Sequence, residues 1–282
     1  MTASGEMAGR VCVVTGASGG IGKAAAAGLA ARGATVVLVV RSRERGEAAR
    51  DEIARATGSR ALHVVLADLS RQADVRRAAD EVRTAVGAVH VLLNNAATYT
   101  ARRKVTEDGI ELQWAVNHLA PFLLTNLLMP ALAAARSARV VTVSSNAHRS
   151  AVLRWDDVQM KRGFYRGLRQ YCNTKLANLL FTRELARRAA GDGVTANALH
   201  PGVVATELLL GGFPPLRLVR RWMRTPEQGA ATALYLATDP AVAGVTGEYF
   251  IDNRPVPPTP AATDDDSARR LWQLSEEMVG MG

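Results

Sequence analysis

The 282-residue chain has only two cysteines, few aromatic residues and no long hydrophobic run. Cys12 and Cys172 do not have the spacing of a disulfide framework or a zinc site, and the histidines are scattered singly, so we expect no metal ion. No apolar run reaches about 18 residues, so no membrane-spanning helix is expected. The start, MTASGEMAGR, is too short and polar for a signal peptide. We therefore expect a cytoplasmic protein with a flexible N-terminus over residues 1–9.

Acidic residues are also scarce relative to basic ones, which gives a formal net charge of +9. Most of the basic residues are arginines spread along the chain, and aromatic residues make up only 5%. A nucleic-acid-binding protein more often concentrates its charge in a stripe with interleaved aromatic side chains. We therefore expect no nucleic-acid partner. Attraction of a polyanionic cofactor is a sufficient functional reason for the charge, and arginine-rich composition alone is the simpler alternative.

Short β-branched runs alternate with longer helical segments along the chain. The runs that predict strands are Val11–Thr15, Thr35–Val40, Leu62–Leu66, Val89–Leu93, Arg139–Ser144, Val194–Leu199 and Glu248–Ile251. Helical periodicity fills the gaps at Ile21–Ala31, Arg45–Ala56, Asp74–Val86, Gly109–Ala135, Tyr171–Ala190 and Pro226–Ala237. Near-continuous apolar strands between helices indicate a parallel sheet covered on both faces. The predicted fold class is α/β, a single Rossmann-like, doubly wound domain over residues 1–282.

Two arginine-rich stretches, residues 148–169 and 203–224, interrupt this alternation. Both follow expected strand ends at the edge where doubly wound sheets bind ligands, so we interpret them as substrate-side loops. The apolar part of 203–224 favours a small, fairly apolar substrate, although its arginines could instead meet an acidic group. Residues 252–282 form a C-terminal extension with a proline-rich start and a helix, DDDSARRLWQLSEEMV, whose acidic beginning suits a helix N-terminus.

The first expected strand runs directly into the glycine-rich segment TGASGGIG, which an alanine-rich helix follows. Gly16, Gly20 and Gly22 suit a tight turn that brings the backbone and a helix N-terminus close to a pyrophosphate. A Walker phosphate loop is excluded, because Ala17 and Ala24 stand where that motif needs Gly and Ser or Thr. The segment therefore predicts a dinucleotide site, with a glycine-rich turn that binds nothing as the alternative.

The end of the second expected strand distinguishes NAD from NADP. An NAD site commonly places an acidic residue there, whereas this chain has Val40 followed by Arg41. Without a carboxylate to repel a 2′-phosphate, and with a guanidinium to bind it, NADP(H) is favoured over NAD(H). Arg43 is better interpreted as a solvated charge. Asp68, after the third strand, could accept from an adenine amino group, and a helix cap is its alternative role.

Tyr171 and Lys175 are four residues apart, so they share one face of the expected helix. A lone pair of this kind is more often an aromatic residue beside a solvated lysine. A tyrosine pKa near 10 is high for proton exchange at neutral pH, and a nearby ammonium is expected to lower it. Ser144 and Ser145 end the fifth strand and point to opposite faces, so only one can reach a substrate.

In this order, the motifs resemble the short-chain dehydrogenase/reductase family over almost the whole chain. The matching segments are TGASGGIG at 15–22, Asp68, NNAA at 94–97, Asn117, Ser145 in VTVSSNA, YCNTK at 171–175 and PG at 201–202. KLANLLFTREL, NALHPGVVATEL and ARRLWQLSEEMVG are most similar to the retinol-dehydrogenase-like branch. The resemblance implies hydride transfer between a nicotinamide and a carbonyl or alcohol, with Tyr171 as proton donor or acceptor.

The resemblance also implies roles for individual residues. It places Asn117, Ser145, Tyr171 and Lys175 in catalysis: the serine holds the substrate oxygen, the lysine also donates to the ribose, and the asparagine anchors a water that relays protons. The residues it places around the cofactor are Gly16, Ser18, Gly20, Ile21, Gly22, Arg41, Asp68, Leu69, Asn95, Ala96, Tyr171, Lys175, Pro201, Gly202, Val204 and Thr206.

One feature of the sequence departs from the family pattern. The family usually has glycine where this chain has Ala97, which bears on the local shape of the pocket if that position needs a positive φ. The resemblance also implies a homo-oligomer, a dimer or tetramer. The alternative function is a non-catalytic dinucleotide sensor or scaffold on the same fold, and such proteins typically lose the tyrosine or the lysine that this chain keeps.

Overall fold

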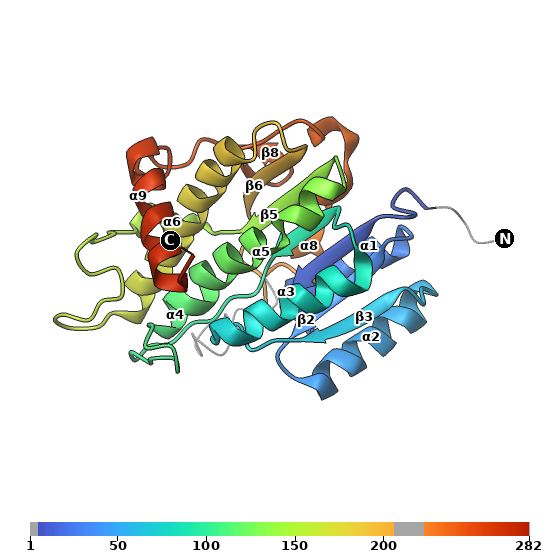
Figure 1. The fold of residues 1–282 in the computed structure, drawn as a ribbon, viewed down its shortest axis with the longest axis horizontal. Helices are drawn as coiled ribbons and strands as arrows, with labels where there is room; N and C mark the ends of the chain where they lie inside the picture. The colour runs from blue at the N-terminus through green and yellow to red at the C-terminus, as the bar shows by residue number, and fades with distance from the viewer. Residues whose placement is uncertain (1–4, 206–222, 282) are drawn as a thin grey trace.

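The computed structural model describes residues 5–205 and 223–281 (Figure 1). The strands are β1 (Val11–Thr15), β2 (Thr35–Val40), β3 (Leu62–Leu66), β4 (Val91–Asn94), β5 (Ala138–Val143), β6 (Val194–His200), β7 (Tyr249–Ile251) and β8 (Arg254–Pro255). The α-helices are α1 (Gly20–Ala31), α2 (Arg43–Thr57), α3 (Gln72–Val86), α4 (Leu112–Trp114), α5 (Ala120–Ala134), α6 (Gly167–Arg188), α8 (Pro226–Thr238) and α9 (Asp265–Val279). A π-helical turn, η1 (Ala115–Leu119), joins α4 to α5, and the short 3-10 helices are η2 (Asn146–Ser150), η4 (Pro240–Val242) and η5 (Pro260–Ala262).

The strands form one sheet in the order β3-β2-β1-β4-β5-β6-β7-β8. Neighbouring strands from β3 to β7 pair in parallel, and β8 pairs antiparallel with β7. The chain therefore builds outward from β1 to β3 and then returns to place β4 on the other side of β1. In doubly wound sheets this change of direction marks the place where ligands bind, beyond the carboxyl ends of the strands. The predicted fold class is confirmed.

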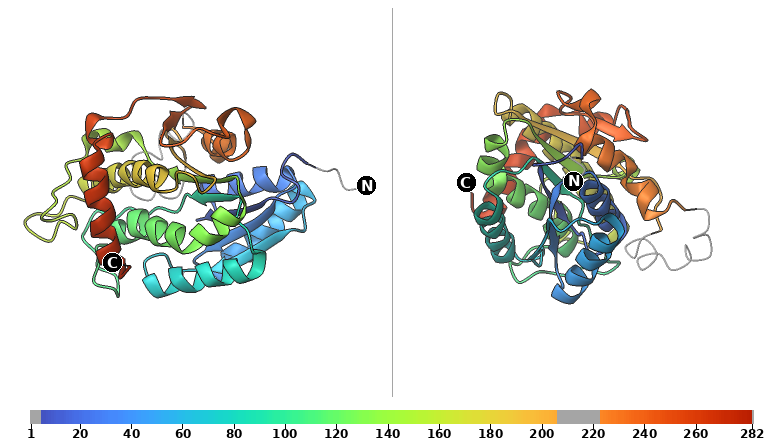
Figure 2. Two further views of the ribbon diagram at one scale, coloured as in Figure 1. Left: turned by 45° about the horizontal axis from the view of Figure 1, so that its top comes forward. Right: turned by 90° about the vertical axis from the view of Figure 1, so that its right-hand side faces the viewer.

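Helices cover both faces of the sheet (Figure 2). The strands alternate their side chains between the two layers: Cys12 and Val14 of β1 belong to the core beneath α1, α2 and α8, whereas Val13 belongs to the core beneath α3, α5 and α6. Because both faces are buried, β1 and its neighbours are apolar at nearly every position rather than at every second one.

The predicted helix over residues 109–135 is not continuous from its expected start. It begins at Leu112, because Glu111 is its N-cap and accepts hydrogen bonds from the backbone N–H groups of Gln113 at 3.0 Å and Trp114 at 2.8 Å. This carboxylate is fully buried, which is unusual unless its oxygens are satisfied. The cap therefore fixes where the helix containing Asn117 begins.

The π-helical turn in the middle of this helix has a cause in the sequence. Proline has no backbone N–H, so Pro121 cannot make the α-helical bond to the carbonyl of Asn117, four residues earlier. The pairing shifts by one residue, and the N–H of Ala120 reaches the carbonyl of Ala115. Such turns occur frequently at functional sites. The Asn117 carbonyl therefore receives no hydrogen bond from residue 121.

The segment Leu112–Ala134, which spans α4, η1 and α5, is the one stretch of the described residues long and apolar enough to cross a membrane by length and composition. Of the window that passes this test, 72% is buried inside the structure. A core helix of a soluble protein passes the same test, so this is weak evidence for a membrane span. The expected cytoplasmic location stays a prediction.

The C-terminal extension packs its helix α9 against α6. Trp272 of α9 stacks on Phe181 at 5.9 Å and meets Phe122 edge-on at 4.9 Å between ring centroids. The guanidinium of Arg188 lies 4.5 Å from the indole. Trp272 is 4% exposed, so α9 covers apolar side chains of both α5 and α6.

Residues 5–9, expected as part of a flexible N-terminus, form a turn against the end of α1. Met7 is buried, and its N–H donates to the carbonyl of Arg32 at 2.9 Å. The side chain of Met7 belongs to the core beneath α1, α2 and α8. The expectation of a free segment therefore does not describe residues 5–9.

Candidate active site

The loops that carry the predicted site residues all follow strands β1 to β6, which run parallel and therefore end at one edge of the sheet. The described members are Gly16, Ser18, Gly20, Ile21, Gly22, Arg41, Asp68, Leu69, Asn95, Ala96, Ser145, Pro201, Gly202 and Val204. Thr206 and most of the predicted loop 203–224 lie outside the described residues. The sheet therefore gathers segments that are far apart in the sequence at one edge.

The glycine loop between β1 and α1 has the backbone geometry of a phosphate-binding turn. Gly16 and Gly20 have positive φ values of +67° and +53°, which side chains disfavour. A Cβ on Gly22 would lie 2.4 Å from the carbonyl oxygen of Gly16, so the start of α1 packs directly on the loop. No side chain caps α1. Its first N–H groups are therefore available to an anion such as a pyrophosphate.

Thr15 and Asn95 tie the loop after β4 to the loop after β1. The hydroxyl of Thr15 accepts from the N–H groups of Asn95 and Ala96, both at 3.0 Å, and the Asn95 amide donates to the Thr15 carbonyl at 2.8 Å. The Asn95 side chain thus holds the two loops together. Ala97 is not among the residues with positive φ, so alanine at this position costs no backbone strain.

Three arginines, Arg41, Arg43 and Arg45, follow β2. Arg43 lies 3.5 Å from Glu47 on the same helix. Arg41 is exposed and makes no hydrogen bond or ion pair to another described residue. The guanidinium of Arg45, which the sequence analysis did not single out, lies 3.7 Å from where a Cβ on Gly19 would be. Arg45 therefore places positive charge beside the glycine loop, and Arg41 adds an exposed charge directly after β2.

Asp68 after β3 is a turn residue rather than the helix cap that was its alternative role, because Arg71 is the N-cap of α3. Its Oδ1 accepts from the backbone N–H of Ser70 at 3.0 Å and from the Ser70 hydroxyl at 2.7 Å. The other carboxylate oxygen makes no hydrogen bond to a described residue, so an adenine amino group has one acceptor to use. Leu69 packs against the core beneath α3, α5 and α6.

Tyr171 and Lys175 lie in the first turns of α6, as the spacing predicts. The lysine side chain is 2% exposed, its Nζ donates to the carbonyl of Val143 at 3.0 Å, and it lies 5.4 Å from the centroid of the tyrosine ring. Tyr171 is only partly buried. The pair therefore presents the phenol toward the edge of the sheet with the ammonium behind it.

The predicted lowering of the Tyr171 pKa is wrong for this structure. Burial raises the pKa of Tyr171 to about 12, and it lowers the pKa of Lys175 to about 8. The physical cause is the same for both residues, since removing water disfavours the charged form of each group. At neutral pH the phenol carries its proton and the lysine is mostly charged.

The two serines at the end of β5 divide as the strand alternation predicts. Ser144 is buried, and its hydroxyl donates to the carbonyl of Lys175 at 2.7 Å. Ser145 is partly exposed, and its hydroxyl accepts from the N–H of Ala147 at 3.1 Å. The first serine thus fixes the strand end against α6, and the second presents its hydroxyl proton to the site.

Asn117 is fully buried, and both polar atoms of its side chain are hydrogen-bonded. Its Oδ1 accepts from the N–H of Thr98 at 2.7 Å, and its Nδ2 donates to the Thr98 carbonyl at 2.9 Å and to the Thr174 hydroxyl at 3.2 Å. The asparagine therefore joins the loop after β4 to α6. Pro121 has no N–H to donate to the main-chain carbonyl of Asn117. This carbonyl is therefore the better acceptor for a bound water.

The loop after β6 is held by an ion pair that the sequence analysis did not find. Gly202 has a φ of +84°, and a Cβ there would lie 2.6 Å from Cδ of Arg224. Arg224 forms a bidentate pair with Asp252, with N–O distances of 2.5 and 3.0 Å. Val204 is 4% exposed and packs beneath α8 at Gly229. No local signal links residues 224 and 252 in the sequence.

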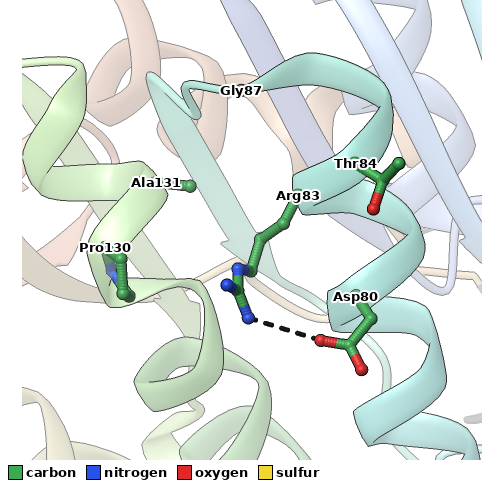
Figure 3. Close-up of a pocket in the computed structure, with 6 residues that line it drawn as sticks. All are labelled: Asp80, Arg83, Thr84, Gly87, Pro130 and Ala131. Carbon is green, nitrogen blue, oxygen red and sulfur yellow. Dashed lines mark hydrogen bonds and ion pairs between the residues drawn. The ribbon is translucent and has the colours of Figure 1, made fainter.

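Two open cavities of about 460 Å³ each flank the fold. One lies between α3 and α5, where Asp80 and Arg83 form an ion pair at 3.3 Å, so its charges neutralise each other (Figure 3). The other lies beneath the predicted substrate-side loop 148–169, and Phe164 and Asn173 are among its lining residues. Asn173 is on α6, two residues from Tyr171. Only this second cavity adjoins the helix of the candidate site.

The chain is similar to known proteins over nearly its whole length. The family model of short chain dehydrogenases matches residues 10–211. Dehydrogenase/reductase SDR family member 13 from Bos taurus is 42% identical over 98% of this chain and 75% of its own length. Human retinol dehydrogenase 14 is 39% identical over 98% of this chain and 88% of its own length.

Solved structures have the same fold. A crystal structure of an uncharacterized protein from Mycobacterium Paratuberculosis has a TM-score of 0.80 at 35% identity, covering 97% of this chain and 94% of that one. A short chain dehydrogenase from Burkholderia cenocepacia in complex with NADP has a TM-score of 0.71 at 28% identity, covering 87% and 96%.

The relatives are dehydrogenases, which supports an alcohol or carbonyl oxidoreductase. The chain belongs to the short-chain dehydrogenase family, in its retinol-dehydrogenase-like branch. Members of this family use a nicotinamide dinucleotide and act on small molecules.

Proposed function

We propose that the protein is an NADP(H)-dependent oxidoreductase that interconverts a carbonyl and an alcohol on a small, fairly apolar substrate. The observation that carries the proposal is the Ser144–Lys175 hydrogen bond of 2.7 Å, which holds the end of β5 against the α6 turn that follows Tyr171. This bond brings Ser145 and the Tyr171–Lys175 pair, which are 26 residues apart in the chain, into adjoining segments of one site.

Each of these side chains has a role that its protonation state supports. The bound cofactor supplies the hydride. In the direction of reduction, Tyr171 enters with its proton, because burial keeps its pKa near 12, and donates it to the substrate oxygen. The charge of Lys175 then stabilises the phenolate that remains. The Ser145 hydroxyl donates to the same oxygen and orients it.

A proton must return to Tyr171 before the next turnover, and Asn117 offers a place for the water that relays it. The side-chain atoms of Asn117 are occupied by Thr98 and Thr174. Its main-chain carbonyl, to which Pro121 donates no hydrogen bond, is the acceptor that we assign to this water.

The preference for NADP(H) rests on Arg41 and Arg45. Arg41 follows β2 with no carboxylate next to it, and the Arg45 guanidinium lies beside the glycine loop at Gly19. Guanidinium groups bind a phosphate through paired hydrogen bonds, so both positions suit a 2′-phosphate. The similar Burkholderia cenocepacia structure holds NADP, which supports the same preference.

The preference for an apolar substrate rests on the aromatic side chain beside the acid. Tyr99, from the loop after β4, meets the Tyr171 ring edge-on at 6.3 Å between centroids. Phe164 and Val152 of the loop 148–169 are exposed and line the cavity next to α6. These side chains suit an apolar group on the substrate, although the same cavity is also lined by four arginines, Arg154, Arg162, Arg166 and Arg169, which suit an acidic group.

The test is a turnover assay that follows NADPH oxidation across aldehydes, ketones and quinones, with NADH at equal concentration as the comparison. Tyr171→Phe is expected to lower kcat by about 100- to 10,000-fold, because the general acid is lost, and to change the Kd for NADPH by less than threefold. Arg41→Ala and Arg45→Ala are each expected to weaken NADPH binding more than NADH binding.

Three outcomes would contradict parts of this proposal. Substantial turnover by Tyr171→Phe would exclude that residue as the acid, and equal affinity for NADPH and NADH would remove the role of Arg41 and Arg45. Tight NADPH binding without turnover of any carbonyl would favour a dinucleotide sensor or scaffold. A homo-oligomer stays a prediction that size-exclusion chromatography with light scattering would test.

A further inference from the structure

His148 is a buried histidine three residues after the serine that presents its hydroxyl to the site. It is 1% exposed, and its backbone N–H donates to the carbonyl of Ser145 at 3.1 Å. Its ring nitrogen Nδ1 lies 2.7 Å from the same carbonyl oxygen. A carbonyl only accepts, so Nδ1 carries the proton and donates. One residue thus supplies two hydrogen bonds to the Ser145 carbonyl.

The imidazole is itself held in place by strands from the C-terminal half. The ring of Tyr249 on β7 meets it edge-on at 5.2 Å, and the Tyr249 hydroxyl donates to Oδ1 of Asn146 at 3.2 Å. The N–H of Asn146 donates to Nδ1 of His200, at the end of β6, at 3.4 Å. Both strands therefore brace the turn that follows Ser145.

A buried histidine at this position lowers the stability of the fold. Its Nε2 has no hydrogen-bond partner among the described residues, and burial lowers the pKa of the ring, so the imidazole is neutral with one buried nitrogen unsatisfied. A leucine of similar size would fill the space without that cost. Residues that break a local rule of stability occur mainly where function requires them.

We propose that His148 is a positioning residue for Ser145: the hydrogen bond from its imidazole to the Ser145 carbonyl holds the serine hydroxyl where the substrate oxygen binds. The carbonyl and the side chain that carries the hydroxyl are both attached to the Cα of Ser145, so a rotation of this peptide would move both. The inference rests on the proposed function, in which Ser145 orients the substrate oxygen, and it assigns no contact between His148 and the substrate.

The first test compares His148→Leu, His148→Asn and the control His90→Leu with wild type by kcat, Kd for NADPH and melting temperature. His148→Leu removes the donor and keeps the bulk, and it is expected to lower kcat by about 10- to 100-fold with an NADPH Kd within threefold of wild type. His148→Asn keeps a donor near the position of Nδ1, and it is expected to recover most of the lost rate. A merely structural role would not separate kcat from cofactor affinity in this way.

His90→Leu is the matched control. His90 lies just before β4, at the opposite edge of the sheet, and its Nδ1 accepts from the N–H of Val11 at 3.1 Å. This variant also loses one histidine–backbone hydrogen bond, so its melting temperature is expected to fall while kcat stays within twofold of wild type. An equal loss of kcat in His90→Leu and His148→Leu would overturn the proposal.

A double-mutant cycle with Ser145→Ala shows whether His148 acts through the serine. If it does, Ser145→Ala combined with His148→Leu is no slower than Ser145→Ala alone. Additive losses would mean that His148 acts by another route and would overturn the proposal. If Tyr171→Phe is inactive but His148→Leu retains full kcat, the proposed function stands and only this inference fails.

Hydrogen–deuterium exchange of the segment 144–151 provides a readout that needs no substrate. The N–H groups of Ala147 and His148 both bond to Ser145, so His148→Leu is expected to raise exchange there by at least tenfold while α1 and the glycine loop remain unchanged. If the wild-type protein turns over no carbonyl, this measurement still decides whether His148 holds the turn. Unchanged exchange in the segment would overturn the inference.

Discussion

The half of the sheet proposed to bind the cofactor (the cofactor half, β1 to β3) and the half proposed to carry catalysis (the catalytic half, β4 to β7) build their parts of the candidate site by different means. In the cofactor half the decisive atoms belong to the backbone: Gly16 has a positive φ, and Gly22 leaves no room for a side chain. In the catalytic half the decisive atoms belong to buried polar side chains: Ser144 and Lys175 each donate a hydrogen bond to a backbone carbonyl of another segment.

This difference separates what a short stretch of sequence can specify from what needs the whole fold. A glycine loop carries its geometry within a few residues, so its function is visible locally. A buried lysine or asparagine acquires its role only from partners that the fold brings to it. We expect changes in the two halves to affect different quantities, cofactor affinity in one and turnover or stability in the other.

The largest expected effect is on the stability of the catalytic half. Trp272→Ala removes the ring that packs on Phe122 and Phe181, and it is expected to lower the free energy of unfolding by about 3–5 kcal/mol. The Kd for NADPH should stay within threefold, measured at a temperature where the variant is folded. Trp155→Ala, which removes a partly exposed ring, is the control and should cost less. A large loss of NADPH affinity would mean that the halves are not separable.

The next effect is on cofactor affinity. Gly22→Ala places a Cβ 2.4 Å from the Gly16 carbonyl oxygen, a backbone atom that cannot move without opening the loop. A strain of about 3 kcal/mol corresponds to a loss of NADPH affinity of roughly 100-fold. Gly244→Ala is the control, because a Cβ there meets nothing within 4 Å. Titration calorimetry measures both variants, and unchanged affinity in Gly22→Ala would contradict the geometry.

A smaller effect, with a defined pH dependence, concerns Lys175. Burial lowers its pKa to about 8 from 10.5, so below pH 8 the folded protein bears the cost of a buried ammonium. Lys175→Met, although inactive, is therefore expected to be more stable than wild type by about 2 kcal/mol at pH 7.

Between pH 8 and 10.5 the unfolded chain binds more protons at this lysine than the folded one, so wild type gains stability relative to Lys175→Met as the pH rises. Denaturant unfolding of both proteins at pH 7, 9 and 10.5 measures the difference. A gap that does not narrow across this range would show that Lys175 is not the group responsible.

The smallest effect is expected on the surface of the cofactor half. Lys23 of α1 and Glu52 of α2 form an ion pair with side chains 36% and 52% exposed. Exposed pairs of this kind contribute little, so Lys23→Gln should change the free energy of unfolding by less than about 0.5 kcal/mol, and less at high salt. A change above 1 kcal/mol would show that surface charge, rather than backbone fit, holds the cofactor half together.

Much of the fold was predictable because its signals are local. The predicted strands and helices are present, and the alternation of β1 between two layers of core explains its unbroken apolar run. The predicted start of the helix at residue 109 was wrong, because the cap at Glu111 is a buried carboxylate whose partners, Tyr165 and Gln170, come from a distant loop and helix.

The candidate site was predictable in its residues but not in its energetics. The spacing of Tyr171 and Lys175 placed them on one helical face, but the direction of the tyrosine pKa shift followed from burial, which spacing does not reveal. Arg45 and the Arg224–Asp252 pair escaped notice because each acts on a segment far away in the chain. His148 is only three residues from Ser145, but its burial against Tyr249 of β7 has no local signal.

The sequence by itself determined the parallel sheet, the glycine turn and the shared helical face of Tyr171 and Lys175, because periodicity, glycine positions and helical spacing are properties of neighbouring residues. The choice of Ser145 came from the resemblance to the family. The tertiary structure decided how those residues are charged and oriented. It alone buries Lys175, places Ser144 against α6 and packs Tyr249 against His148, because dielectric environment and packing partners depend on which distant segments come together.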